Sequence, residues 1–326
     1  MIRTATRRVV GLLAIQCLNV ALATPPTPAN AASTRPLPER LAWQVALDRV
    51  GFSPGVIDGN PGRKTEVATR EFQRVRGLPQ TGTLTLATAA ALGVDPTSVT
   101  ISYSLTAHDL AQVVPTPAEW LARSQQKWLG YESIDAVIAE KFHCTRGLLG
   151  RLNPGKNLLS LQPGETVVVP NIGEATSTPR AEAIEIDLPA KIIRVLDAEQ
   201  RLVGLLHCSI AADKARRPSG AARVEVVVAE PTYLFDPKMW PEVKGIDRKL
   251  LIPAGPRNPV GRCWIGLSLP GYGIHGTPQP EMIGKTGSHG CFRLTNWDAM
   301  RLGKMIRPGA KVRFLSGEPT LAYAGQ

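Results

Sequence analysis

The first third of the chain has the apolar spacing of amphipathic helices. Ala68, Phe72 and Val75 are spaced four and three residues apart, and charged residues occupy most positions between them. This spacing places the three side chains on one helix face, which is expected to be buried. Turn-forming Gly, Pro and Asp residues separate this segment from its neighbours. We therefore predict a small all-α domain over residues 38–94, with helices at 39–50, 64–76 and 84–92.

The next part of the chain combines a helical pattern with one strand. An apolar stripe of helical spacing begins with Ile134 and Val137. A Pro-Gly-Glu turn then precedes the strand-like run at 166–169. These features predict an α+β module over residues 128–172. Residues 95–127 contain Thr, Ser and Pro without periodicity, so we predict a linker there.

The last part of the chain changes to short runs rich in Val, Ile and Leu, separated by turn residues. One helix is expected at 296–306, with Thr295 as its N-cap and Asp298 three residues on. Many strands and a single helix predict a mainly-β domain over residues 183–316, built as a sandwich or a partly closed barrel, followed by a tail at 317–326. The expected strands are 183–188, 191–196, 201–210, 224–229, 263–269 and 311–315.

The N-terminus has the pattern of an export signal. Arg3, Arg7 and Arg8 precede an apolar run that ends in a small-x-small sequence at Ala23. We predict a signal peptide at 1–23; the alternative is an uncleaved membrane anchor, for which the run is short. The Pro- and Ala-rich residues 24–37 form a flexible lead. The chain is therefore expected to be exported to the periplasm or cell envelope, without stable membrane insertion after cleavage.

Charge indicates the kind of partner. The chain has 38 basic and 27 acidic residues, and loss of residues 1–23 removes three arginines and no acid, which leaves 35 basic residues and a net charge of +8. Such a surface attracts anionic partners. An exported protein rarely meets nucleic acid, so we expect an acidic envelope polymer instead. The proportions of apolar and charged residues are those of a folded soluble protein.

Four cysteines follow the predicted signal, and two readings of them stay open. An even number in an oxidising compartment is compatible with two disulfides. If one thiol is a nucleophile, at most one disulfide can form among the other three. The four residues are Cys144, Cys208, Cys263 and Cys291.

Cys291 stands in a sequence suited to nucleophilic catalysis. A cysteine attacks as its thiolate, and an imidazole can take its proton. His275 is the candidate base, because a Gly- and Pro-rich segment after it can return the chain to Cys291. Gly290 leaves room for a substrate carbonyl, and the N–H groups around His289, Gly290 and Cys291 are candidate oxyanion donors.

Neighbouring residues have expected supporting roles. His289 is expected to orient substrate or polarise the site, and Ser288 to fix the loop by a hydrogen bond. Arg293 is expected either to hold a substrate carboxylate or to pair with Asp298. We also expect Gly276 and Thr277 to contact substrate. A zinc site at His275, His289 and Cys291 is a weaker alternative, because the usual ligand spacing is missing; we expect no metal and no cofactor.

Two upstream segments resemble bacterial wall-binding modules. The first resembles the peptidoglycan-binding domain and the second a LysM module that lacks its opening strand and turn. The residues of the first are Gly51-Phe52, Pro54-Gly55, Ile57-Asp58-Gly59, Gly62, Lys64-Thr65, Phe72-Gln73, Gly77-Leu78 and Thr81-Gly82. Those of the second are Leu152-Asn153-Pro154 and Pro163-Gly164-Glu165-Thr166-Val167. The resemblance implies peptidoglycan binding, with a spacer or scaffold role as the alternative for each module.

The C-terminal domain resembles the L,D-transpeptidase (YkuD) family. The matching residues are Pro259-Val260-Gly261, Trp264-Ile265, Gly273 to Thr277, Ile283-Gly284 and Ser288 to Leu294. The resemblance implies a mainly-β fold and a cysteine acyltransferase acting on peptidoglycan, with no glycosyl transfer. Cys291 would form a thioester at the L,D bond of a tetrapeptide stem, and His275 would move the protons.

The resemblance leaves the acceptor open. A second stem's amine would give a 3→3 cross-link, a wall-anchored lipoprotein could be attached, and water would make the enzyme an L,D-carboxypeptidase or endopeptidase. A rival of another class is a wall-binding scaffold whose catalytic domain is idle.

Overall fold

The computed structural model describes residues 35–173, 179–240, 243–288 and 290–316. The predicted signal peptide, most of the predicted lead and the predicted tail lie outside these residues, as does His289. Within the described ranges, no helix combines the length and the apolar character needed to cross a bilayer.

The three helices predicted near the N-terminus are confirmed. They are α2 (Leu37–Arg49), α3 (Arg63–Val75) and α4 (Leu86–Leu92). Helix α3 buries Ala68 and Phe72 as the apolar spacing predicted, but Val75, at the end of the helix, is 41% exposed, so its predicted burial was wrong. The Phe72 ring meets Phe52 edge-on with centroids 5.6 Å apart. Gln73 of α3 joins this helix to the loop before α4 and to α4 itself. Its side-chain oxygen accepts from Gly82 N, and its side-chain nitrogen donates to the hydroxyl of Thr88.

The middle of the chain forms a strand–helix–helix–strand module. Strand β1 (Thr100–Ser104) pairs antiparallel with β2 (Thr166–Pro170). Helices α7 (Ile134–Lys141) and α8 (Arg146–Leu152) lie between them in sequence, and α5 (Ala107–Ala111) and α6 (Trp120–Ser124) precede α7. The interpretation of residues 95–127 as a linker without an opening strand was therefore wrong. The five residues Thr-Ile-Ser-Tyr-Ser of β1 do alternate polar and apolar positions, a short strand pattern that the linker interpretation overlooked, although none of them is fully buried.

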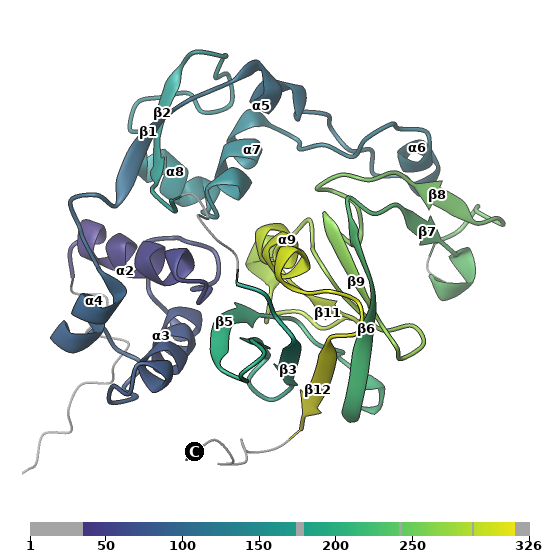
Figure 1. The fold of residues 1–326 in the computed structure, drawn as a ribbon. Helices are drawn as coiled ribbons and strands as arrows, with labels where there is room; N and C mark the ends of the chain where they lie inside the picture. The colour runs from purple at the N-terminus through teal and green to yellow at the C-terminus, as the bar shows by residue number, and fades with distance from the viewer. Residues whose placement is uncertain (1–34, 174–178, 241–242, 289, 317–326) are drawn as a thin grey trace, which may run out of the picture.

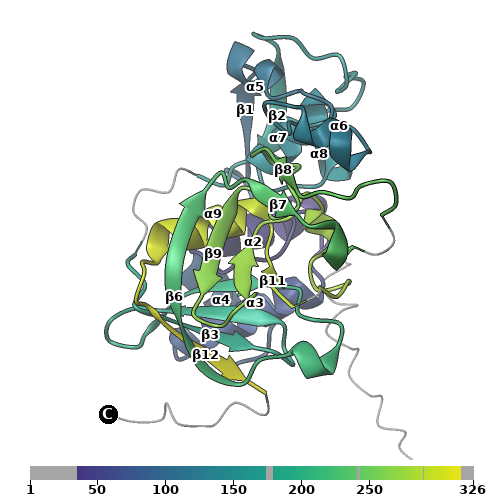
Figure 2. The same ribbon diagram turned by 90° about the vertical axis from the view of Figure 1, so that its right-hand side faces the viewer.

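Eight strands form one sheet in the C-terminal domain, in the order β11-β10-β9-β6-β12-β3-β4-β5. All neighbours are antiparallel except β10–β11 and β12–β3. The sheet curls, and the predicted helix α9 (Asn296–Met305) packs against it (Figures 1 and 2). The strands are β3 (Ala183–Asp187), β4 (Ile192–Leu196), β5 (Leu202–His207), β6 (Gly220–Ala229), β9 (Cys263–Leu267), β10 (Gly273–His275), β11 (Phe292–Arg293) and β12 (Lys311–Leu315).

The chain beyond β5 closes the curled sheet. Ser209 and Arg293 exchange both backbone hydrogen bonds, at 2.9 and 3.0 Å, which joins the β5 end of the sheet to β11. Of the two architectures that the sequence allowed, the structure is therefore the partly closed barrel. The core inside it includes Ile265, Ile274 and Phe292, all fully buried.

A small hairpin, β7 (Tyr233–Phe235) and β8 (Leu250–Ile252), lies outside the sheet and was missed by the sequence analysis. Helix α6 of the middle module packs on it, as Figure 1 shows. The Trp120 ring stacks on Phe235 with centroids 4.3 Å apart. Three short 3₁₀ turns complete the domain, at Lys214–Arg216, Pro237–Met239 and Pro280–Met282.

The N-terminal helices share a hydrophobic core with the catalytic sheet. Every residue of β4 is buried, because one face of the strand points into the barrel and the other is covered by the helical module. Leu47 and Phe72 lie in one cluster with Leu205 of β5. Arg194 on this face is 8% exposed and donates to Glu71 of α3 at 2.7 Å. A strand that is apolar on both faces is expected in such a two-sided environment.

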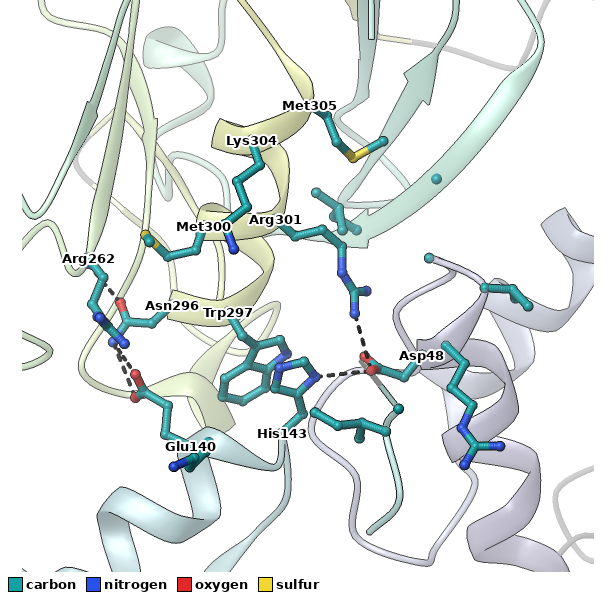
Figure 3. Close-up of a pocket in the computed structure, with 18 of the residues that line it drawn as sticks. Asp48, Glu140, His143, Arg262, Asn296, Trp297, Met300, Arg301, Lys304 and Met305 are labelled. Carbon is teal, nitrogen blue, oxygen red and sulfur yellow. Dashed lines mark hydrogen bonds and ion pairs between the residues drawn. The ribbon is translucent and has the colours of Figure 1, made fainter. Parts of the chain in front are cut away.

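All three modules meet at Asp48. This carboxylate accepts from His143 of the middle module at 3.0 Å and from Arg301 of α9 at 3.2 Å (Figure 3). The His143 ring also stacks on Trp297 with centroids 5.1 Å apart. Burial opposes ionisation of Asp48, but the charges and hydrogen bonds of Arg301 and His143 outweigh it and lower the pKa of Asp48 below its usual range. The modules are thus joined by a buried ionic contact as well as by apolar packing.

The shared core predicts that the helical module and the sheet unfold together. Leu205→Ala should lower the free energy of unfolding by about 2–5 kcal/mol, because it opens a cavity between the two modules. Urea unfolding followed by circular dichroism and tryptophan fluorescence should give coincident transitions for the native chain. Leu86→Ala is the control, because Leu86 is 92% exposed. It should change the free energy of unfolding by less than about 0.5 kcal/mol. Separate transitions for the two modules would contradict a common core.

Candidate active site

Parallel pairing of β10 with β11 places the two candidate catalytic residues on neighbouring strands. His275 is the last residue of β10 and is in register with Arg293, while Ile274 is in register with Phe292. Cys291 directly precedes β11, so it lies beside Gly273, two positions before the partner of His275. Side chains two positions apart point to the same face of a sheet. Both residues are therefore held by one backbone ladder, although they are sixteen positions apart in sequence.

The Cys291 thiol is partly exposed and free. Its Sγ donates to the carbonyl oxygen of Gly271 at 3.6 Å. Burial raises the pKa of Cys291, and a hydrogen bond from the backbone of Gly273 opposes this only in part. The resting residue is therefore a thiol at neutral pH, and it needs a base to become a nucleophile.

His275 is placed to be that base. Its ring is 6% exposed and stacks on Trp264 with centroids 5.8 Å apart. Nδ1 lies 2.7 Å from the carbonyl oxygen of Gly276. A carbonyl oxygen only accepts, so Nδ1 carries the proton and Nε2 is left as an acceptor. Burial lowers the pKa of His275 to about 4, and the charge of Arg293 acts in the same direction.

The Cys291 thiol and the His275 imidazole are thus both neutral in the resting site. A thiol with a raised pKa faces an imidazole with a lowered pKa, so a preformed thiolate–imidazolium pair is disfavoured. The hydrogen bonds of the described residues do not include one between Cys291 Sγ and His275 Nε2. Proton transfer therefore requires the thiol to leave the Gly271 carbonyl, and apo active sites often tighten in this way only when substrate binds.

Ser288 shapes the loop that carries the nucleophile. Its hydroxyl donates to the carbonyl oxygen of Cys291 and accepts from Gly290 N at 3.3 Å. Its own backbone is fixed by Ile210 and Ala212, through bonds of 2.9 and 3.0 Å. The expected loop-fixing role of Ser288 agrees with these contacts. A Cβ added at Gly290 would lie 3.8 Å from the Tyr272 ring, so the space beside the nucleophile is open.

Arg293 braces the same loop. Its Nη2 donates to the carbonyl oxygens of Thr286 and Gly287 and to the Thr286 hydroxyl. The alternative pairing with Asp298 does not occur: Asp298 is fully buried, accepts from the Ser53 hydroxyl at 2.8 Å and lies 3.9 Å from Arg301. Asp298 instead serves α9, where its backbone N–H donates to Thr295 as the capping pattern predicted.

Gly276 and Thr277 have packing roles. A Cβ at Gly276 would lie 2.3 Å from Asn296 Oδ1, so glycine is required for the contact with α9. Thr277 is 5% exposed, and its hydroxyl accepts from Gln279 N at 3.3 Å. The burial of Thr277 therefore gives no support to the expected contact with substrate.

The structure adds aromatic residues that the sequence analysis did not assign to the site. Burial, hydrogen bonding to Trp240 and the charge of Cys291 all act on the Tyr233 hydroxyl, and the net effect raises the pKa of Tyr233. Tyr233 therefore brings the β7–β8 hairpin close to the nucleophile. Trp240 Nε1 donates to the Tyr233 hydroxyl at 3.1 Å, and Tyr272 donates to Arg216 O at 2.8 Å. No local pattern links a hairpin tyrosine to a cysteine that follows 58 residues later.

The remaining cysteines that the structure describes are buried, as is His207. Cys144, Cys208 and Cys263 are free and buried, and burial raises the pKa of each thiol, to about 12 for Cys144 and about 11 for Cys263. His207 is buried, and its Nε2 lies 3.0 Å from the carbonyl oxygen of Lys64. The described residues contain no group of three or more side chains suited to hold a metal.

Comparison with known proteins gives two matches to family models. Residues 181–313 match the L,D-transpeptidase catalytic domain, and residues 37–92 match a putative peptidoglycan binding domain. A curated relative, the putative L,D-transpeptidase YkuD of Bacillus licheniformis, is 28% identical over 181 residues, which cover 56% of this chain and 92% of the relative.

Solved structures are more distant. An L,D-transpeptidase from Xylanimonas cellulosilytica is 17% identical with a TM-score of 0.36, over 85% of this chain and 92% of that one. A mutant L,D-transpeptidase from Enterococcus faecium is 18% identical with a TM-score of 0.32; the match covers 42% of this chain and half the length of that one.

The burial pattern predicts selective alkylation of one thiol. In the folded chain without the predicted signal peptide, iodoacetamide should modify Cys291 and leave Cys144, Cys208 and Cys263 intact, because Cys291 is the one partly exposed cysteine among the residues that the structure describes. The rate should keep rising above neutral pH, because burial raises the pKa of Cys291. Peptide mass spectrometry measures the site, and the same reaction in urea is the control that should label all four. A rate that levels off near neutral pH would contradict a thiol resting state.

The state of His275 predicts the acid limit of activity. The imidazole accepts a proton only when neutral, so acylation of Cys291 should be retained as pH falls to about 5 and decline as pH passes through about 4. Below that point the rate should fall by about tenfold per pH unit. The second-order rate constant for acylation of Cys291, measured as a function of pH, gives this acid limit. Circular dichroism at each pH shows whether the chain stays folded. An acid limit near the ordinary histidine pKa would contradict the assigned burial effect.

Proposed function

We propose that this chain acts as a peptidoglycan L,D-transpeptidase, a cysteine acyltransferase, and the match of residues 181–313 to the L,D-transpeptidase catalytic domain supports this proposal. The observation that carries the proposal is the pair formed by Cys291 and His275. A partly exposed free thiol lies at the start of β11, and a buried neutral imidazole with a defined tautomer ends the adjacent strand β10.

The first half of the reaction forms a thioester. Cys291 Sγ attacks the carbonyl carbon of the L,D peptide bond between the third and fourth residues of a tetrapeptide stem. His275 Nε2 takes the thiol proton at the same time. The backbone N–H groups of Gly290 and Cys291 stabilise the oxyanion. When the intermediate collapses, the C–N bond breaks, and His275 returns the proton to the departing amine of D-Ala.

The second half transfers the acyl group. The amine of an acceptor stem attacks the thioester carbonyl, and His275 Nε2 accepts the proton that the amine loses. Collapse of this second intermediate breaks the C–S bond, and the proton restores the thiol of Cys291. The product is a 3→3 cross-link between two stems.

The acceptor could be another nucleophile. The amine of a wall-anchored lipoprotein would give protein anchoring, and water would give carboxypeptidase or endopeptidase activity through the same thioester. The match of residues 181–313 to the L,D-transpeptidase catalytic domain supports transfer to an amine, so transfer is the activity that we propose.

The remaining modules support a role at the wall. The match of residues 37–92 to a putative peptidoglycan binding domain favours peptidoglycan as the substrate. The pairing of β1 with β2 and the two helices α7 and α8 before β2 support the proposal that the middle module is LysM-like and contacts glycan, although the short helices α5 and α6 also lie between the strands. Export to the periplasm or envelope is proposed from the signal-like residues 1–23.

The mature chain should convert disaccharide-tetrapeptide into dimers with release of D-Ala. Cys291→Ala should abolish the reaction, and His275→Gln should slow it by roughly 10²–10⁴-fold, because the proton acceptor is lost. Mass spectrometry of the products distinguishes the outcomes. Dimers support transfer, and tripeptide alone would make the chain a hydrolase.

A matched variant separates loss of the nucleophile from loss of any thiol. Cys263→Ala removes another free cysteine, which is buried beneath α9 next to Gly303. It should retain the native rate if the chain stays folded. A native chain that is folded and makes neither dimer nor tripeptide would leave the scaffold role as the better explanation.

A further inference from the structure

A groove of about 610 Å³ lies between the helical module and the catalytic domain, apart from Cys291. We call it the intermodule groove. One wall is formed by the loop before α3 and the first residues of α3. The other wall is formed by the β3–β4 turn, the end of β5 and residues 281–285. The last of these segments belongs to the loop that connects His275 with Cys291.

Positive charge dominates this groove. Four cationic side chains line it against two carboxylates. One carboxylate, Asp58, is already engaged by Gln44 Nε2 at 2.9 Å and by Asn60 N at 2.8 Å. The cations are Arg63, Lys64, Lys191 and Lys285, and the second carboxylate is Glu281. The groove therefore suits an anionic ligand.

Lys64 is built into the groove. Its methylene chain crosses Gly55, where a Cβ would lie 2.7 Å from Lys64 Cδ, and Gly55 has the φ of +83° that favours glycine. Its Cε reaches Gly284 of the active-site loop, at 3.7 Å from the position of a Cβ there. Its carbonyl oxygen is held by His207 at 3.0 Å. Burial lowers the pKa of His207 to about 3, so this ring is neutral and donates the bond.

The ammonium groups of Lys64 and Lys285 interact as like charges, and Asp298 and Asp58 act on Lys64 in the opposite direction. Within the described residues, neither ammonium group makes a hydrogen bond or an ion pair. Burial and the charge of Lys285 lower the pKa of Lys64. An anion that contacts both ammonium groups reduces the repulsion between these two like charges. The two groups come from different modules, so one bound anion would link the helical module to the active-site loop.

A chain of hydrogen bonds also connects the groove to the segment that carries Cys291. Lys191 Nζ donates to the carbonyl oxygen of Gly284 at 3.0 Å, and Gly284 N donates to the Ser209 hydroxyl at 2.8 Å. Ser209 in turn pairs with Arg293 in β11. A ligand in the groove therefore lies against the segment that positions Cys291.

We propose that the intermodule groove binds the carboxylate groups of a peptidoglycan stem peptide, away from the bond that reacts, with Lys64 and Lys285 as the principal contacts. This site rests on the proposed transpeptidase function, because that function supplies an acidic wall peptide as substrate. It assigns to the helical module a direct part in holding the substrate of the catalytic domain.

The binding test uses the full mature chain with Cys291→Ala, which does not consume the ligand. Disaccharide-tetrapeptide should bind roughly tenfold more tightly than the same compound with its carboxylates amidated. Lys64→Met with Lys285→Gln should remove this difference; Met keeps the apolar contact with Gly55 and loses only the charge. Lys127→Gln with Lys311→Gln is the control, because it removes two exposed lysines outside the groove and should preserve the difference.

Three outcomes would overturn the proposal. The first is equal affinity of the native groove for the acidic and amidated compounds. The second is an equal loss of affinity in the groove variant and the control variant. The third is displacement of the acidic compound by inorganic phosphate as effectively as by free stem peptide. The last outcome would make the groove a phosphate site.

Kinetics with Cys291 intact separate this proposal from the proposed function. The groove variant should raise KM for disaccharide-tetrapeptide roughly tenfold and change kcat less than about twofold, because the contact is equal in ground and transition states. Acylation by a carbapenem should be unchanged. If native protein forms no thioester and no product, the transpeptidase proposal fails; if it reacts normally but KM is unaffected in the groove variant, only the groove assignment fails.

Discussion

The backbone pairing of Arg293 is the constraint on which the site depends. One edge of β11 is in register with β10, which ends at His275, and the other exchanges two hydrogen bonds with Ser209 beyond β5. The segment after Cys291 thereby closes the curled sheet. Its neighbours Ser288 and Gly290 are then fixed by Ile210, Ala212 and the Ser288 hydroxyl. A nucleophile in a closing strand is held from both sides, which limits its freedom before substrate arrives.

This rigid frame explains the charge states of the catalytic pair. Closing the barrel buries His275 against Trp264 and partly buries Cys291, and burial favours the neutral form of both groups. Before substrate binds, Cys291 and His275 are therefore both neutral and form no ion pair. Its chemistry depends on a proton moving from sulfur to Nε2 when a carbonyl is bound, and the bond from Nδ1 to Gly276 keeps Nε2 ready to accept it.

The modules form one body around this frame. The helical module covers the outer face of β4 and β5, Asp48 joins all three modules through His143 and Arg301, and α6 supports the hairpin that brings Tyr233 to the site. Under the proposed function, a helical module fused in this way would set the direction from which a polymer reaches the active site. In a two-sided packing of this kind, substrate contacts can come from both partners of the interface.

Sequence by itself determined the elements that local pattern controls. Helical periodicity and capping residues predicted α3 and α9, and apolar runs predicted six strands of the sheet. The sequence around Cys291 and Gly290, with His275 upstream, predicted the candidate catalytic pair. Tertiary structure decided what depends on contacts distant in sequence. Strand β1 has the alternating sequence Thr-Ile-Ser-Tyr-Ser, but it is short and half exposed, and its pairing with β2 is what establishes it. Arg293 contacts its own loop because β11 pairs both with β10 and with the chain beyond β5, and barrel closure is a long-range event that no local pattern records.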